Sequence, residues 1–244
     1  MNSYYLISGC VSSSQSPTVT GNNALAIGAQ SQALGNDSFA MGTSAWAQTA
    51  DSLALGNETT ANGAGAVAIG GTYAGGGAEA TAANAIAIGS NATSNIAGYV
   101  ALGANSVDNE LRAVNSSIII GGTTYNFSGT NASSAVSVGS SGAERIIQNV
   151  GAGSISSTST DAVNGSQLYA VEQAADKAQS TATAASTAAS TALSTATVAS
   201  SAASSAVSTA NSTAAYVSTA KTSIDQSVSD AKAAASSAST SATA

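Results

Sequence analysis

The sequence predicts a fibrous protein that begins as a parallel β-solenoid and ends as a long α-helical coiled coil. Three observations predict this fold class: a five-residue phrase that recurs at a nearly fixed spacing, an alternation of large and small apolar residues inside each phrase, and a C-terminal segment made almost entirely of Ala, Ser and Thr. A short fixed period indicates stacked coils, each of which buries its apolar side chains only against its neighbours.

The phrase occurs six times and ends in glycine each time. The copies are ALAIG (24–28), SFAMG (38–42), SLALG (52–56), AVAIG (66–70), AIAIG (85–89) and YVALG (99–103), so the closing glycines follow one another in steps of 14, 14, 14, 19 and 14 residues. Alternation over this length predicts a short strand, because successive side chains of a strand point to opposite faces. The glycine permits a turn or a close approach of two backbones.

In every copy, two large apolar residues flank an alanine. The constant alanine indicates that both faces of the strand are covered, the alanine face by something very close. We expect the large pairs to form the core of the repeat: Leu25 and Ile27, Phe39 and Met41, Leu53 and Leu55, Val67 and Ile69, Ile86 and Ile88, and Val100 and Leu102.

A second glycine follows several phrases by seven residues. It occurs at Gly35, Gly63 and Gly77, while Thr49 and Ile96 take the corresponding place elsewhere. This weaker signal divides each coil into two short strands. Asparagine and serine near the phrases are expected to satisfy the ends of the coils by capping turns.

The single 19-residue step places an insertion between residues 70 and 85. Insertions project from a solenoid as loops and do not interrupt the stacking of its coils. Such loops often bind ligands, although an insertion without a function is the more frequent case. We name Tyr73, Gly75, Gly76 and Trp46 as candidate ligand contacts. The tryptophan is either an exposed platform for a sugar or protein, or a residue packed against a neighbouring coil, which we favour.

Composition excludes several classes of function. Net charge is −7 with five basic residues, which excludes a nucleic-acid footprint. The chain has no histidine and one cysteine, Cys10, so histidine-dependent catalysis, a histidine metal site and an intrachain disulfide are excluded. The carboxylates show no pairing pattern for acid–base chemistry. We therefore expect no enzyme, no cofactor and no metal.

Both ends of the repeat region differ from it. Residues 1–20 are expected to be a lead-in, in which Ile7–Cys10 resembles the processing box of a bacterial lipoprotein without the preceding hydrophobic segment, so N-terminal processing stays open. Beyond Asp108 the period stops. Residues 109–143 are expected to be a β connector, with two β segments around Gly121–Gly122 and one further echo of the phrase, AVSVG, at 135–139.

A specific resemblance follows this connector. The segments RIIQNV (145–150), AG (152–153) and DAVNGSQL (161–168) resemble the neck of trimeric autotransporter adhesins. The phrases resemble the NSVAIG-type repeats of YadA-like heads, most closely at Asn22–Gly28 and Asn84–Gly89. The resemblance divides the chain into a head at 21–108, a neck at 144–167 and a stalk at 168–244.

The resemblance implies a left-handed parallel β-roll trimer, joined by the neck to a parallel trimeric coiled coil. Residues of the neck are expected to fasten one subunit to the next, although they could instead bind a ligand. They are Arg145, Asn149, Asp161, Asn164, Gln167 and Leu168.

The stalk sequence has a heptad pattern. With Ile224 at position d, all d positions are apolar: Leu168, Ala175, Ala182, Ala189, Ala196, Ala203, Ala210, Val217 and Ile224. The a positions are mixed, but six large residues fall in one register, which favours a thin parallel coiled coil. They are Leu168, Leu193, Val207, Val217, Ile224 and Val228. Helix order beyond Val228 stays open, because no large residue follows it.

We therefore expect a homotrimeric fibre on the cell surface, tethered to the outer membrane through a segment outside this chain. Its partners would be extracellular-matrix or cell-surface proteins or glycans, or like molecules on other cells, bound through many weak contacts. Two alternatives stay open. A phage tail fibre would need a virion-binding N-terminus, for which the roughly 20 residues before the first repeat are few. A passive spacer of an extracellular filament would have no receptor.

Overall fold

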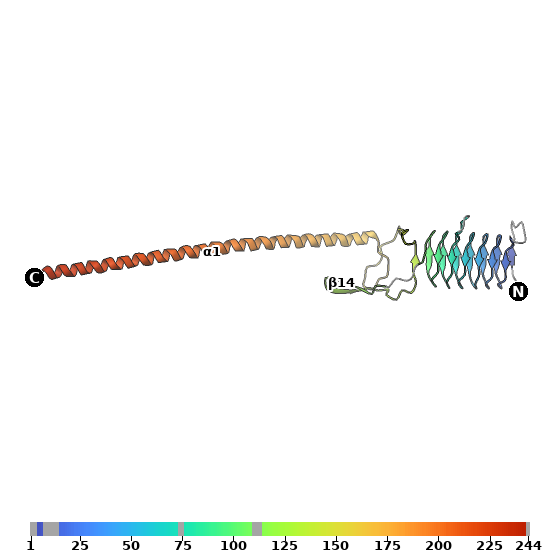
Figure 1. The fold of residues 1–244 in the computed structure, drawn as a ribbon, viewed down its shortest axis with the longest axis horizontal. Coiled ribbons are helices and arrows are strands. Elements are labelled where there is room, and N and C mark those ends of the chain that lie inside the picture. The colour runs from blue at the N-terminus through green and yellow to red at the C-terminus, as the bar shows by residue number, and fades with distance from the viewer. Residues whose placement is uncertain (1–3, 7–14, 73–75, 109–113, 243–244) are drawn as a thin grey trace. The chain divides into compact units, whose positions relative to one another are not determined.

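The computed structural model describes residues 4–6, 15–72, 76–108 and 114–242, and the chain divides into two compact units at Asn164–Gly165. The first unit contains a stack of short-stranded coils, and the second is a single long helix (Figure 1). The predicted β-solenoid followed by a helical stalk is confirmed.

Two parallel sheets form the sides of the solenoid. The first, sheet A, has eight strands in the order β1 (Tyr4–Leu6), β3 (Leu25–Ile27), β5 (Phe39–Met41), β7 (Leu53–Leu55), β9 (Val67–Ile69), β11 (Ile86–Ile88), β13 (Val100–Leu102) and β16 (Val136–Ser137). The second, sheet B, has six strands in the order β2 (Thr18–Val19), β4 (Gln32–Ala33), β6 (Trp46–Ala47), β8 (Thr60–Ala61), β10 (Glu79–Ala80) and β12 (Thr93–Ser94). Six successive coils thus contribute one strand to each sheet, as predicted, whereas β13 and β16 have no counterpart strand in sheet B among the described residues.

Small side chains fill the space between the two sheets. Alanines of both sheets are fully buried, including Ala40 and Ala54 of sheet A and Ala47 of sheet B. The buried hydroxyls are satisfied by the turns beside them: Ser38 donates to the carbonyl of Gly35, at 2.6 Å. Equivalent bonds join Ser31 to Gly28, Ser52 to Thr49 and Thr59 to Gly56. The interior of each coil is therefore thin and closely packed.

The large residue pairs lie on the opposite face of sheet A. Because alternate residues of a strand point to opposite sides, burial of the alanines turns the large pairs outward. They are only partly covered within one chain, and Leu102 is 44% exposed. These pairs were predicted to be the core of the repeat, but the interior of the single chain is made of alanine. The large pairs form a continuous apolar face instead.

Tight corners connect the strands. Residues in the left-handed conformation recur every seven positions, among them Asn23, Gln30 and Asp37, with φ of 54°, 59° and 55°. Corner side chains also bond from coil to coil, as the Asn23 amide does when it donates to the Asp37 carboxylate (3.2 Å). Gly42 has φ +137°, and a Cβ there would lie 2.3 Å from the Gly56 carbonyl oxygen, so the stack requires glycine at this corner.

The insertion begins immediately after a phrase. The backbone N–H of Ala78 donates to the carbonyl of Gly70 (2.8 Å), closing a turn that spans three residues in other coils. The prediction that Gly77 divides its coil is wrong, because the five extra residues precede it. The corner that stacks on Gly63 is instead at Ala82, whose carbonyl oxygen would lie 1.8 Å from a Cβ on Gly63.

The segments that flank the repeats contribute further strands. β1 and β2, from the expected lead-in, pair with β3 and β4. Beyond the roll, β14 (Ser117–Ile120) and β15 (Thr123–Asn126) form an antiparallel hairpin around Gly121 and Gly122, which confirms the two predicted β segments. The echo AVSVG supplies β16, which pairs with β13.

The second unit is α1, Gly165–Ala242, which begins three residues before the expected start of the stalk. Many of its Ser and Thr hydroxyls donate to the carbonyl four residues earlier, as Thr181 does to Lys177 at 2.9 Å. Lys221 and Asp225 form an exposed ion pair one turn apart. No segment of the described helix is long and apolar enough to cross a lipid bilayer.

Candidate functional site

The outward face of sheet B carries mostly polar side chains. The first residue of each strand points away from the alanine interior, and strand pairing aligns these residues in one row: Thr18, Gln32, Trp46, Thr60, Glu79 and Thr93. Trp46 is the one tryptophan of the chain and is 39% exposed. It lies between Gln32 and Thr60 in the row, with part of its ring open to solvent.

A hollow of about 270 Å³ lies beside Trp46 on this face. Its lining is Ser16, Thr18, Gln30, Gln32, Ser44 and Trp46. The Ser44 hydroxyl donates to the amide oxygen of Gln30 (3.3 Å), which aligns two of the lining side chains on adjacent coils. The hollow therefore combines one aromatic ring with uncharged hydrogen-bonding groups.

The other candidate ligand contacts lie at the insertion. Tyr73 and Gly75 lie outside the described residues. The carbonyl of Gly76 accepts hydrogen bonds from the Asn91 backbone N–H (3.0 Å) and the Ser90 hydroxyl (3.3 Å), which hold it against the next coil. Gly76 takes no part in lining the hollow beside Trp46.

A buried carboxylate ends sheet B. Asp108 is 6% exposed and accepts hydrogen bonds from the Ser94 hydroxyl (3.0 Å) and from the backbone N–H groups of Asn95 and Ile96 (2.8 and 2.9 Å). In earlier coils, the equivalent N–H donates to a carbonyl of the next coil, as Thr81 does to Ser94. The Asp108 carboxylate thus takes the place of the carbonyl acceptor that a further strand of sheet B would supply. The sequence identified Asp108 only as the last residue of the repeat region and did not predict these hydrogen bonds.

Arg145 fastens the neck to the last coil of its own chain. Its guanidinium donates to the Ser106 hydroxyl (2.8 Å), the Val138 carbonyl (2.5 Å) and the Ala104 carbonyl. Arg145 was predicted to join subunits, and these three bonds lie within one chain. The three acceptors are uncharged oxygens, two backbone carbonyls and one hydroxyl, and none is a carboxylate.

Two further neck residues fix the local backbone. The Asp161 carboxylate accepts from the Ser154 backbone N–H (2.9 Å), and the Asn164 amide donates to the Val150 carbonyl (3.1 Å). Asn149 adopts the left-handed conformation, with φ of 60°. These contacts fold the neck phrase back on itself before the helix begins.

Several large apolar side chains of the neck and hairpin have little cover within the chain. Ile146 is 86% exposed and Leu168 is 66% exposed, whereas Gln167 is partly buried. The others of this set are Ile118, Ile119, Ile120, Tyr125, Phe127, Ile147, Ile155 and Val163. So much exposed apolar surface is typical of an interaction surface.

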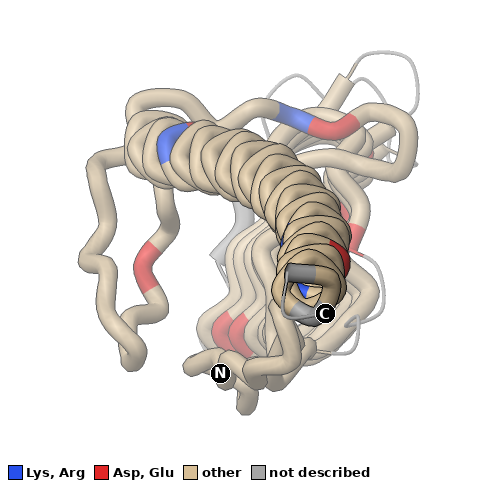
Figure 2. The backbone as a smooth tube through the Cα atoms, turned by 90° about the vertical axis from the view of Figure 1, so that its left-hand side faces the viewer, with Lys and Arg blue, Asp and Glu red and all other residues tan. Residues whose placement is uncertain are grey.

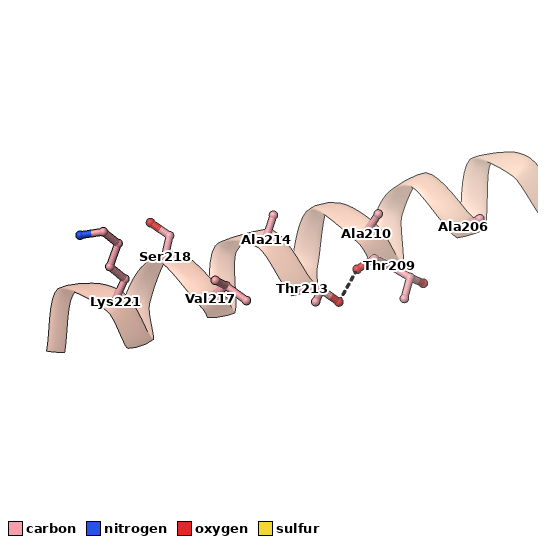
Figure 3. A pocket seen from close by; sticks show the side chains of 8 residues that line it. All are labelled: Ala206, Thr209, Ala210, Thr213, Ala214, Val217, Ser218 and Lys221. Carbon is pink, nitrogen blue, oxygen red and sulfur yellow. Dashed lines mark hydrogen bonds between the residues drawn. The ribbon is translucent and has the colours of Figure 1, made fainter. Parts of the chain in front are cut away.

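The helix presents one stripe of small and apolar residues. Figure 3 shows this face from Ala206 to Lys221, with Ala210 and Val217 from the predicted d positions and Ala214 and Lys221 from the predicted a positions. All these side chains come from one helix, so the hollow that they line is open along its side. Four of the eight side chains drawn lie at the predicted a and d positions, and one of these four is the charged Lys221.

Charged side chains are sparse along the chain (Figure 2). Hydrogen bonds from the backbone N–H groups of Glu144 and Gly142 hold the pKa of the exposed Glu144 carboxyl below its usual value. Among the described residues, no group of three or more His, Cys, Asp or Glu side chains could hold a metal ion.

Two family models match the chain. The coiled stalk of trimeric autotransporter adhesins matches residues 147–243, and the YadA head domain repeat matches residues 20–45, 50–71 and 74–92. The head matches cover most of the solenoid between residues 20 and 92, and the stalk match covers most of the neck and the helix, which is the order that the sequence predicts.

Individual proteins show the same likeness over shorter lengths. Over 57 residues the chain is 61% identical to the autotransporter adhesin BtaE of Brucella suis biovar 1 (strain 1330), which is 23% of this chain and 8% of that relative. The C-terminal YadA-like domain of a Burkholderia pseudomallei protein is 37% identical, with coverage of 50% of each chain and a TM-score of 0.37.

Proposed function

Since the chain belongs to the trimeric autotransporter adhesins, we propose that three copies form a fibre that attaches the bacterium to other surfaces. The family is surface-exposed, anchored in the outer membrane and adhesive rather than catalytic. The observation that carries the proposal is the large apolar face of sheet A, which one chain leaves partly exposed.

Three rolls that pack through sheet A would cover this face. Each phrase supplies two large side chains at the same outward positions, so the face is continuous along the solenoid. Complete burial of one Leu or Ile side chain contributes about 1.5–3 kcal/mol. Because these side chains are only partly buried in one chain, association can bury the rest of their area and gain part of this free energy. The large pairs are then the core of the trimer, while the alanines are the core of each chain.

The neck and the helix support the same assembly. Three helices joined through the d positions would bury Leu168, Val217 and Ile224, each of which is exposed in one chain. The alanines between them contribute less area, so this seam alone is weak. The neck isoleucines Ile146 and Ile147 would be covered where the three chains converge.

In this trimer, sheet B faces solvent and is presented three times. Weak contacts repeated on three chains, and on many fibres, add up by avidity without one deep site. The targets that we propose are matrix or cell-surface molecules and like fibres on other bacteria. A passive spacer would have the same fold and no such contacts.

An attachment assay separates these functions. Beads that carry the chain are tested for retention on matrix-coated and cell-coated surfaces and for clumping with one another. We expect retention or clumping by the trimer and loss of both in Ile86→Asp, which places a charge in the apolar face. Beads that neither attach nor clump while the chain is trimeric would indicate the spacer.

A further inference from the structure

We propose that the hollow beside Trp46 binds a neutral saccharide. The proposal rests on the adhesive function proposed above and names one class of ligand for it. A saccharide has a face of C–H groups bordered by hydroxyls, and it is bound best by an aromatic ring flanked by uncharged hydrogen-bonding groups. This face of sheet B offers that combination.

The aromatic part of the site is Trp46. Trp46 is 39% exposed in the middle of a row of polar residues, so part of its apolar ring is accessible for stacking against a ligand. Strand pairing with β4 and β8 fixes the backbone of β6 on both sides. The ring therefore stands on a rigid element, as a stacking surface requires.

The polar part of the site comes from two further coils. Ser16 and Thr18 line the hollow from the first coil, and Gln30 and Gln32 from the next. The bond from Ser44 engages the Gln30 amide oxygen, and the amide nitrogen of the same side chain is a hydrogen-bond donor at the hollow. Hydroxyl and amide groups together offer both donors and acceptors, which matches the two-way hydrogen bonding of sugar hydroxyls.

Charge favours a neutral ligand over an anionic one. No Lys or Arg precedes Arg112, so the whole repeat region contains carboxylates and no cation. A sulfated or uronic-acid polymer would find no countercharge there. A proline-rich peptide fits less well, because grooves for such peptides are lined by several aromatic rings and this hollow has one.

The site has its own reporter, since Trp46 is the only tryptophan. Tryptophan fluorescence of the 244-residue chain is followed while maltotetraose, cellotetraose, chitotetraose and a galactose-terminated tetrasaccharide are added in turn. A heparin oligosaccharide and a proline-rich peptide are the comparison probes. We expect a saturable shift in emission with at least one neutral tetrasaccharide and none with heparin.

Two substitutions locate the binding. Gln32→Ala keeps the reporter and should weaken binding about tenfold, and Trp46→Ala, followed by calorimetry, should weaken it by tenfold or more. Thr93→Ala is the matched control, at the same outward position of sheet B outside the hollow, and should leave affinity unchanged. Circular dichroism verifies that each variant is folded, and light scattering verifies that its mass in solution equals that of the unmodified chain.

The outcomes separate the two proposals. No response to any neutral probe, an equal response to heparin or the proline-rich peptide, or binding that survives both substitutions would overturn the saccharide site. A trimer that attaches to surfaces without binding saccharide contradicts this inference alone. A chain that binds saccharide as a monomer contradicts the trimeric fibre alone.

Discussion

Replacing Asp108 with alanine tests how the solenoid ends. The carboxylate accepts bonds from the Ser94 hydroxyl and from the N–H groups of Asn95 and Ile96, at 2.8–3.0 Å. Without it, the Ile96 N–H loses its acceptor, whereas the Ser94 hydroxyl keeps a second acceptor, the Tyr99 carbonyl (3.2 Å). A buried donor left unsatisfied costs about 1–3 kcal/mol. Asn95 is exposed and can turn to water, so we expect the last coil to be destabilised by about 2 kcal/mol, from the Ile96 N–H.

Hydrogen exchange with peptide resolution measures this effect directly. A loss of about 2 kcal/mol should accelerate exchange in the peptide containing Asn95 and Ile96 about thirtyfold, if local opening governs exchange. Asp108→Asn keeps one carbonyl oxygen and should lose about half as much free energy. Glu79→Ala removes an exposed carboxylate from the same sheet and should change little. Unchanged exchange in Asp108→Ala would refute the capping role.

Three further substitutions test other parts of the account. Ile86→Asp should lower the stability of the assembly by several kcal/mol if sheet A is an interface, but by less than about 1 kcal/mol if that face is solvated, as denaturant midpoints over a range of concentrations will show. Deleting Thr72–Gly76 restores the 14-residue step and retains buried Ala78, so the melting temperature should stay within a few degrees; a large drop would show that the insertion supports the stack. Gly42→Ala should cost more than 1 kcal/mol because of its positive φ and close backbone contact, whereas Gly151→Ala, which meets no atom within 4 Å, should be nearly neutral.

The choice of deletion shows how the structure refines a prediction from spacing. Removing Ala74–Ala78 would also restore the period, but it would bring Tyr73 to the place of Ala78, which is fully buried. A tyrosine there overpacks an interior built for alanine. The period gives the length of the insertion, and the burial of Ala78 shows that this residue belongs to the coil.

The repetitive parts of the fold were predictable because each coil repeats the same local interactions. Alternation of large and small residues predicted the strands, and recurrence of glycine predicted the corners, as at Gly42. The heptad pattern likewise predicted the helix, although its start at Gly165 precedes the first d residue. These features depend on neighbours at fixed sequence distances, which a single sequence displays.

The non-repetitive contacts could not be predicted in the same way. Asp108 bonds residues 12–14 positions earlier, and Arg145 reaches Ser106 and Ala104 across about 40 residues of irregular chain. Their partners depend on the path of that chain, which no period constrains. The exposure of Trp46 is a similar case, since its neighbours in sequence do not say which face of sheet B lies outward.

The mass of the chain in solution tests the central claim most directly. Light scattering on the 244-residue chain, whose mass is 23.1 kDa, should give three times that value, and the result should hold on dilution. The measurement needs no ligand and no variant, and circular dichroism on the same sample verifies that strands and helix are present. A folded, stable species of 23.1 kDa would contradict the account, because sheet A, the neck and the helix seam would then remain exposed to water.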